Sequence, residues 1–402
     1  MTINVRTRRY WLRAGGLGVA VAMLAATATS ASAGQAAAAR PRARAGASAA
    51  RSVTRPAAAL AAGVPKLTVQ QMAGQRVIYS YPGLTPPASL LWLIRHGDVG
   101  GVIFFGQNIA SEAQVAGVIR ELDAANASTL NPARAYPLLL MTDQEGGEVR
   151  RLPGAPALSE KQIGESRYAS EEATAAGKGA AANLRGVGMN VNLAPVLDVY
   201  RQAGDFDDQY GRSYSMNPQV VSYLGSDFIK AQQAGGVAAT AKHFPGLGAA
   251  AADQDTDTGP VVLNLSAATI RGVDELPYKA AIADGVDLIM VSWAFYPALG
   301  GRPAGLSPAI VQGELRGRLG YKGVTITDAL EAGGLRAYGS IGNRALLAAE
   351  AGMDLILCSG QDAAEGSEAR DSLADGYKDG KLGAPSFDAA LNRVLALRAR
   401  LP

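Results

Sequence analysis

The chain has 402 residues, of which 48 are Gly and only 6% are aromatic, and its formal net charge is +3. This composition excludes a fibrous protein, and Cys358, the only cysteine, excludes an intramolecular disulfide framework or a cysteine-built metal site. The positive charge comes from residues 1–65, which carry nine Arg and no acid and leave 29 basic against 35 acidic residues beyond them. The rest of the chain is therefore acidic and lacks the basic face that nucleic-acid binding needs, so we expect no nucleic-acid partner.

Residues 1–33 have the pattern of a secretion signal. A basic start precedes an apolar run over residues 14–26, and Ala31-Ser32-Ala33 is a small-residue cleavage site. Thr7-Arg8-Arg9-Tyr10-Trp11-Leu12-Arg13 resembles the twin-arginine export motif, with ordinary Sec export as the alternative. The apolar run is shorter than the about 20 residues of a transmembrane helix. We expect a mature protein that is secreted or associated with the cell wall, without an integral membrane segment.

Residues 34–65 consist largely of Ala, Arg, Pro and Ser, a composition that predicts a disordered tether. The remaining residues, 66–402, are assigned to one domain because α/β barrels of roughly 250 residues and more form single domains. We expect this domain to be a monomer.

Eight short, nearly continuous apolar runs follow, as is typical of parallel strands covered on both faces. They span residues 76–80, 101–105, 137–141, 189–193, 237–241, 287–291, 323–326 and 353–357. Plausible helices in the gaps cover residues 111–126, 170–186, 218–234 and 344–351. The alternation predicts an α/β protein of the (β/α)₈ TIM-barrel class. A doubly wound open sheet is the rival, although no Gly-x-Gly-x-x-Gly turn follows an early strand.

Polar residues gather just after these runs. They are Gln107, Asn108, Asp143, Gln144, Glu145, Asp198, Lys242, His243, Ser292 and Asp328. In a barrel the carboxyl ends of the strands share one rim, where active sites are built. The pattern therefore predicts a polar site at that rim.

The stretch from Gly236 to Asp257 is the most informative part of this rim. A β run brings Lys242 and His243 to its end, and a bend at Pro245 and Gly246 can turn both donors onto one ligand. The Gly/Ala-rich loop that follows carries three acids and is flexible enough to close over a sugar. A basic strand end followed by a solvated acidic loop is the structural alternative.

A second polar segment runs from Asp143 to Arg151. It places an acid at a strand end and an arginine eight residues on, with the pair Gly146-Gly147 between them. Carboxylates accept hydroxyl groups and guanidinium groups donate to them, as a sugar ligand requires, but a structural ion pair fits these residues equally well.

Six motifs together resemble the family 3 glycoside hydrolases, and within them the single-domain β-N-acetylhexosaminidases. The motifs keep the family's order over about residues 70–360 and are Gly101-Val-Ile-Phe-Phe-Gly-Gln-Asn108, Asp143-Gln-Glu-Gly-Gly147, Asn192-Leu-Ala-Pro-Val-Leu-Asp198-Val199, Gly211-Arg-Ser-Tyr214, Lys242-His-Phe-Pro-Gly246 and Gly323-Val-Thr-Ile-Thr-Asp328-Ala-Leu330. The resemblance implies a TIM barrel and no metal or organic cofactor. Independently of it, His96 and His243 are the only histidines, too few for a typical histidine zinc site.

The resemblance also implies roles for individual residues. Asp328 corresponds to the nucleophile that forms a covalent glycosyl-enzyme, with a helix N-cap as the structural alternative. The positions that hold the non-reducing sugar correspond to Asp143, Arg151, Arg212, Lys242 and His243. Their contacts to sugar hydroxyls would orient the anomeric carbon for attack.

One departure from the family affects catalysis. Hexosaminidases of this family carry Asp-Ser-His in the loop after the Lys-His strand, and its His is the acid/base, whereas this chain has Asp253-Gln254-Asp255 there. Asp255 is the candidate replacement, and Asp253, Asp257 or no residue at all are the alternatives. Crowded carboxylates raise one another's pKa, so one of them could stay protonated.

Two further positions depart from the family. Leu247 and Trp293 stand where His residues are common, and Trp293 is equally consistent with a platform for a sugar ring and with packing.

The sequence thus predicts an exported retaining β-glycosidase. Its expected partner is a carbohydrate, namely terminal β-linked N-acetylglucosamine of cell-wall or chitin-derived oligosaccharides. The alternatives are a β-glucosidase or β-xylosidase of the same family and, because the usual histidine is absent, a catalytically inactive sugar-binding barrel.

Overall fold

The computed structural model describes residues 66–402, so the predicted signal peptide (1–33) and tether (34–65) lie outside the described residues. Eight strands form one sheet in the order β10-β1-β2-β3-β6-β7-β8-β9. Their bounds are β1 (Val77–Tyr79), β2 (Gly101–Ile103), β3 (Leu139–Thr142), β6 (Val191–Asn192), β7 (Ala238–Phe244), β8 (Leu288–Val291), β9 (Val324–Thr327) and β10 (Ile356–Leu357). Each lies within or overlaps one of the eight predicted runs.

The sheet closes into a barrel. Every neighbouring pair in this order is parallel, and a parallel bridge between Ile326 and Leu355 joins β9 to the residue before β10. Leu355 donates its N–H to Thr325 at 2.9 Å and accepts from Thr327 at 3.1 Å. The predicted (β/α)₈ TIM barrel is confirmed, and the open doubly wound sheet is excluded.

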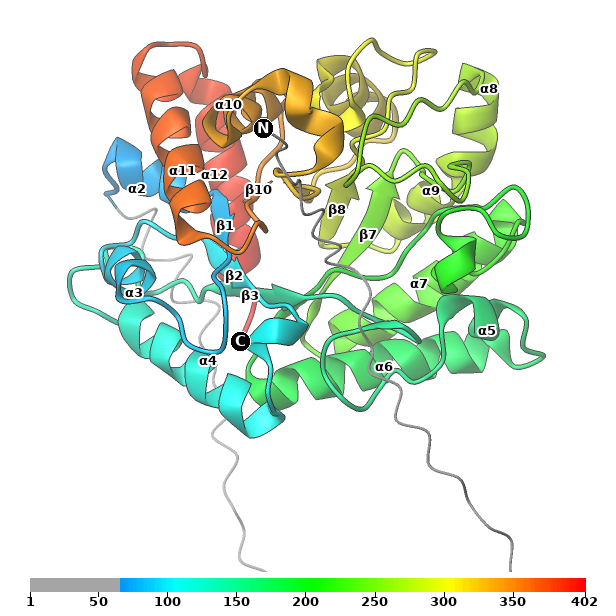
Figure 1. The fold of residues 1–402 in the computed structure, drawn as a ribbon, viewed down its shortest axis with the longest axis horizontal. Helices are drawn as coiled ribbons and strands as arrows, with labels where there is room; N and C mark the ends of the chain where they lie inside the picture. Colours follow the sequence, from blue (N-terminus) through cyan, green and yellow to red (C-terminus); the bar gives the residue numbers. More distant parts are fainter. Residues whose placement is uncertain (1–65) are drawn as a thin grey trace, which may run out of the picture. The chain divides into compact units, whose positions relative to one another are not determined.

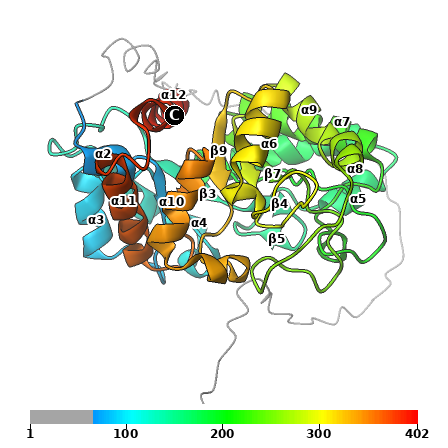
Figure 2. The same ribbon diagram turned by 90° about the horizontal axis from the view of Figure 1, so that it is seen from above.

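Helices surround the strands, and α2, the first described helix, packs against α11, the last but one (Figures 1 and 2). The α-helices are α2 (Val69–Gly74), α3 (Ala88–Arg95), α4 (Glu112–Asn126), α5 (Glu160–Gly164), α6 (Ala169–Val187), α7 (Pro218–Ala234), α8 (Ala267–Thr269), α9 (Leu276–Ala283), α10 (Ile341–Ala351), α11 (Ala363–Lys378) and α12 (Ala384–Arg398). The short 3₁₀ and π-helical turns are η1 (Gly106–Asn108), η2 (Asp208–Tyr210), η3 (Ile270–Asp274), η4 (Ala304–Leu306), η5 (Ala309–Arg318) and η6 (Gly333–Tyr338). None of the helices within residues 66–402 is long and apolar enough to cross a membrane.

Local sequence signals explain where the predicted helices begin and end. Ser111 caps α4 by accepting the Gln114 N–H, and Asn217 caps α7, whose first residue is proline. Gly188 and Gly352 end α6 and α10 with φ of 98° and 102°, in the left-handed region that glycine adopts without steric cost.

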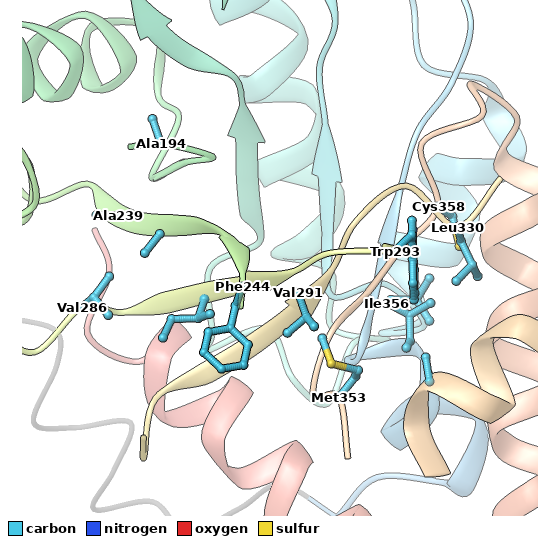
Figure 3. Packing of buried hydrophobic residues seen from close by; sticks show 14 of the residues in the cluster. Ala194, Ala239, Phe244, Val286, Val291, Trp293, Leu330, Met353, Ile356 and Cys358 are labelled. Carbon is cyan, nitrogen blue, oxygen red and sulfur yellow. The ribbon is translucent and has the colours of Figure 1, made fainter. Parts of the chain in front are cut away.

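Apolar residues of the strands are buried on both faces, which accounts for the continuous apolar runs. Ile78, Leu139 and Val324 belong to a cluster inside the barrel. Strand residues of the other face pack against the helices in a larger cluster, part of which, including Phe244 and Val291, is drawn in Figure 3. Both faces of the barrel wall are thus mainly apolar.

Two features shape the carboxyl rim of the barrel. Strand β7 runs to Phe244, three residues beyond its predicted end, so that Lys242 and His243 lie within the strand rather than after it. After β3, the chain forms a small antiparallel hairpin of β4 (Gln144–Gly146) and β5 (Val149–Arg150). Both features bring charged side chains to the rim.

Candidate active site

A buried network of ion pairs joins the ends of β3, β4 and β7. The Lys242 ammonium group lies 2.8 Å from Asp143 Oδ1 and 2.6 Å from Glu145 Oε1, and its side chain is only 2% exposed. Arg212, in the loop after η2, donates from Nε to Glu145 Oε2 at 2.9 Å and from Nη2 to Oε1 at 3.0 Å. Arg151, after β5, lies 4.0 Å from Asp143. Four of the five predicted sugar-holding residues thus form one cluster.

Glu145 connects the two buried cations of this network. Burial acts to raise the pKa of its carboxyl group, but the positive charges of Arg212 and Lys242 and their hydrogen bonds outweigh it and lower the pKa to about 2. The carboxylate is therefore ionised, and its bidentate bond fixes the plane of the Arg212 guanidinium group.

His243, the fifth predicted residue, is bound to Asp198 in the segment that follows β6. Its Nδ1 lies 2.7 Å from Asp198 Oδ2, and Asp198 Oδ1 accepts the Leu247 N–H at 2.5 Å. Burial opposes the charged form of the imidazole, yet the Asp198 carboxylate raises the pKa of His243, and His243 in turn lowers the pKa of Asp198. With Nδ1 donating to Asp198, Nε2 is the ring nitrogen left for a ligand.

Asp328 lies directly after β9, half-buried, and accepts the N–H of Ala329 at 2.7 Å. Trp293 holds the peptide unit between Ala329 and Leu330, because its indole N–H donates to the Ala329 carbonyl at 2.8 Å. Trp293 is fully buried within the helix-facing cluster of Figure 3, so a platform for stacking a sugar ring is excluded and packing is confirmed.

The loop after β7 places its three acids differently. Asp253 is exposed, whereas Asp255 and Asp257 are half-buried. The main chain of this loop is pinned to the turn after Asp328, since Gly333 donates to Asp257 O and Gly334 to Thr256 O, both at 2.9 Å. The loop is therefore anchored at its acidic end, and the flexibility expected from its Gly/Ala composition stays a prediction.

Asp255 lies in the electrostatic field of Asp328. Its Oδ1 accepts the Asp257 N–H at 2.8 Å. Burial raises the pKa of Asp255; the Asp257 N–H opposes this, and the negative charge of Asp328 adds to it. Asp255 thus combines partial burial with a pKa that the charge of the predicted nucleophile helps to raise.

Residues that sequence reasoning left out of the site are Glu145, Asp198 and Asp207. Glu145 and Asp198 appeared only as polar strand ends. Asp207 does not follow a predicted strand, and the only hint of it in the sequence is the acidic run Asp205-Phe206-Asp207-Asp208 shortly before Arg212. Asp207 Oδ1 lies 3.1 Å from Arg212 Nη1, so this acid is part of the same network.

Asp198, Asp207 and His243 bring potential ligand atoms within 4.8 Å of one another. Carboxylates and imidazole also hold divalent metals. Here, however, N–H groups of His243 and Leu247 already bind Asp198, and the Arg212 guanidinium group binds Asp207. Because these contacts already occupy Asp198 and one oxygen of Asp207, we assign no metal to the group.

These features define a class. A closed (β/α)₈ barrel carries, at the carboxyl rim, paired cations and carboxylates suited to a polyhydroxylated ligand and, in the segments after β7 and β9, three half-buried acids. This is the arrangement of a TIM-barrel enzyme that binds a polar substrate.

Comparison with known proteins gives the family. Residues 69–397 match the model of the glycosyl hydrolase family 3 N-terminal domain. An uncharacterized secreted glycosyl hydrolase of Arthroderma benhamiae is 46% identical over 346 residues, which cover 86% of this chain and 97% of that protein. The β-hexosaminidase of Stenotrophomonas maltophilia strain R551-3 is 34% identical over 66% of this chain and 77% of its own.

Solved structures agree with this match. The chain is similar to a family 3 β-N-acetylglucosaminidase from Paenibacillus, with a TM-score of 0.77 and 34% identity over 83% of this chain and 62% of that one. It is also similar to the β-N-acetylhexosaminidase of Beutenbergia cavernae, with a TM-score of 0.76 and 31% identity over 83% and 99% of the two chains. The chain belongs to glycosyl hydrolase family 3, as its motifs predicted. It is a glycosidase, and its substrate is a carbohydrate.

Proposed function

We propose that this protein is an exported retaining β-N-acetylhexosaminidase that removes terminal β-linked N-acetylglucosamine from cell-wall or chitin-derived oligosaccharides. The observation that carries the proposal is the network of Asp143, Glu145, Arg212 and Lys242 at the carboxyl rim of the barrel. Support for the sugar comes from the similarity to β-hexosaminidases and β-N-acetylglucosaminidases.

Asp328 is the proposed nucleophile. Its carboxylate attacks the anomeric carbon, and the bond to the leaving oxygen breaks as an acid protonates that oxygen, which gives a covalent glycosyl-enzyme. Water then attacks the same carbon, gives its proton to the acid/base residue and releases Asp328. The sugar leaves with the β configuration it had at the start.

Asp255 is the proposed acid/base residue in place of the absent histidine. A general acid must hold a proton before the first step, and burial together with the negative charge of Asp328 raises the pKa of Asp255 in that direction. The same loop is anchored to the turn after Asp328, which supports a fixed placement of the acid relative to the nucleophile.

Asp143, Arg151, Arg212, Lys242 and His243 are proposed to hold the non-reducing sugar. Each is buried or nearly so and already has a partner of opposite charge, so its donors and acceptors are oriented before the substrate arrives. Sugar hydroxyls would then meet fixed hydrogen-bonding groups rather than mobile side chains.

Export is proposed from residues 1–33, with their twin-arginine-like motif and small-residue cleavage site. Similarity to the Arthroderma protein, which is named as secreted, supports it. Residues 34–65 would then be a tether and residues 66–402 the catalytic domain, acting as a monomer.

The test is release of 4-nitrophenol by purified mature protein from the β-N-acetylglucosaminide, the β-glucoside and the β-xyloside. Asp328→Ala should abolish turnover. Asp255→Ala should slow it, and azide, which needs no general base to attack the glycosyl-enzyme, should restore turnover in this variant alone. Asp253→Ala is the matched control, because Asp253 is exposed in the same loop.

The outcomes separate the possibilities. Preference for the glucoside or xyloside would overturn the proposed sugar and leave the mechanism in place. Equal effects of the Asp253 and Asp255 substitutions would remove Asp255 as the acid/base. Sugar binding without turnover of any of the three glycosides would contradict the proposed activity.

A further inference from the structure

Asp207 connects two residues of the sugar-holding set. It is 1% exposed, in the loop before Arg212, and its Oδ1 accepts from Arg212 Nη1 at 3.1 Å. On its other side lie Asp198 and His243, with one oxygen of each acid and one ring nitrogen all within 4.8 Å of one another. Asp207 is thus placed between the guanidinium group and the imidazole group that are proposed to bind the sugar.

Asp198 and Asp207 differ in how many of their carboxylate oxygens accept a hydrogen bond. Both Asp198 oxygens accept N–H groups, from Leu247 and from the backbone and ring of His243. Asp207 Oδ2 is buried, and no N–H or O–H group of residues 66–402 is placed to donate to it. Two ionised carboxylates in this position would repel each other without water to screen them. A proton on Asp207 Oδ2 would remove the repulsion and supply a donor toward Asp198.

We propose that Asp207 carries this proton in the active protein and donates it to Asp198, so that Asp207 is a positioning residue that holds Arg212 and His243 in one rigid unit for sugar binding. The inference rests on the proposed function, since it takes Arg212 and His243 as contacts of the sugar. The hydrogen-bonded chain then runs from Arg212 through Asp207 and Asp198 to His243.

The surroundings of Asp207 favour the protonated form at acidic and neutral pH. Burial and the negative charge of Asp198 raise the pKa of Asp207 to about 7, although the positive charges of Arg212 and His243 oppose this. Tyr278 and Tyr296 also sense the charge of Asp207, and burial keeps their hydroxyl groups neutral by raising their pKa. Above pH 7 Asp207 ionises, and the link to Asp198 becomes a repulsion.

The consequence is a sugar affinity that depends on pH. If only the protonated form binds well, the apparent Kd of the sugar rises by about tenfold for each pH unit above 7. Asp207→Asn keeps an acceptor for Arg212 and a donor for Asp198 but does not titrate. Its Kd should therefore rise less steeply with pH than that of the wild type, which a merely structural role of Asp207 does not predict.

The experiment is calorimetric binding of N-acetylglucosamine from pH 5 to 9 to the wild-type protein, Asp207→Asn and Asp207→Ala. Asp208→Asn is the matched control, because Asp208 is the buried neighbour that pairs with Lys161 instead. We expect the alkaline loss of affinity in the wild type and the control, a smaller loss in Asp207→Asn, and weakened binding at every pH in Asp207→Ala. An alkaline loss as large in Asp207→Asn as in the wild type would overturn the proposal.

Infrared difference spectra of wild type and Asp207→Asn test the proton without any ligand. A band of a protonated carboxyl group that is present at pH 6, disappears toward pH 8 and is missing in the variant supports the proposal, and its absence at pH 6 contradicts it. Neither measurement needs turnover. If the protein proved inactive, the proposed activity would be refuted, and the binding and infrared measurements would still decide the role of Asp207.

Discussion

Replacing Glu145 by Gln removes the charge that holds Lys242 and Arg212 together. Glu145 is 2% exposed and contacts both cations within 3.0 Å. The two cations lower its pKa from 4.5 to about 2, and a shift of this size corresponds to ~3 kcal/mol of folding free energy. A similar value, about 3–5 kcal/mol, is typical when one partner of a buried ion pair is removed. The variant should therefore be less stable by ~3 kcal/mol at pH 7.

The sign of the pH dependence follows from the lowered pKa. Glu145 contributes its stability above pH 4.5, and this contribution is lost as the pH falls toward 2, where the carboxyl group is protonated in the folded protein too. For a domain of this size ~3 kcal/mol corresponds to a change in Tm of about 4 °C. Wild type and Glu145→Gln should differ by this amount at pH 7 and converge as the pH approaches 2 to 3.

Thermal unfolding followed by circular dichroism at pH 7, 5 and 3 measures the difference. Glu148→Gln is the control, because Glu148 is exposed in the same hairpin and should leave Tm unchanged at every pH. If the Tm of Glu145→Gln lies as far below that of the wild type at pH 3 as at pH 7, the variant is destabilised by altered packing rather than by the lost charge, which contradicts this prediction. The variant should also bind sugar more weakly, with a raised KM, because Lys242 and Arg212 lose their common anchor.

Three further outcomes follow from the acid loop and the nucleophile. Gly333→Ala should lower kcat by about tenfold with little change in KM, because a Cβ there would lie 2.5 Å from the Thr258 carbonyl and displace the loop that carries Asp255. With a poor leaving group, kcat/KM should fall as the pH rises through the raised pKa of Asp255, and the fall should be weak with 4-nitrophenol. Trp293→Phe removes the hydrogen bond to Ala329 and should destabilise the protein by about 1 kcal/mol in urea unfolding while slowing turnover. The first prediction is contradicted by an unchanged kcat in Gly333→Ala, and the second by the same pH profile for both leaving groups. The third is contradicted by an unchanged urea midpoint in Trp293→Phe.

The barrel could be predicted from the sequence because its signal is local. Each strand is a short apolar run, and its polar end follows directly, so strand number and the position of the rim follow from the chain in order. The helices predicted over residues 111–126 and 218–234 begin within one residue of α4 and α7, which Ser111 and Asn217 cap, whereas α10 begins three residues before its predicted start. The end of β7 was missed because the polar residues Lys242 and His243 continue the strand and find partners in the segments that follow β3 and β6, which no local pattern reveals.

The composition of the site was harder to predict than its position. Arg212 was expected to bind sugar, but its partner Glu145 lies 67 residues away along the chain and no spacing rule connects them. Asp207 was missed for the same reason, since its importance depends on Asp198 and His243, which reach it from β6 and β7. Pairing between residues far apart in the sequence is a property of the closed barrel and is visible only once the strands are assembled.

The charge of the sugar-holding region argues for a neutral ligand. Lys242 and Arg212 are matched by Asp143 and Glu145, and His243 is matched by Asp198. A site in which every buried charge already has a counter-charge gains nothing from a further charge on the ligand, and an unpaired one would be costly to bury. Hydroxyl and amide groups, by contrast, can accept from the cations and donate to the carboxylates without disturbing these pairs. The cost of burying an unpaired charge also favours a proton on Asp207. If ionised, Asp207 would be the one carboxylate of the sugar-holding region without a full counter-charge.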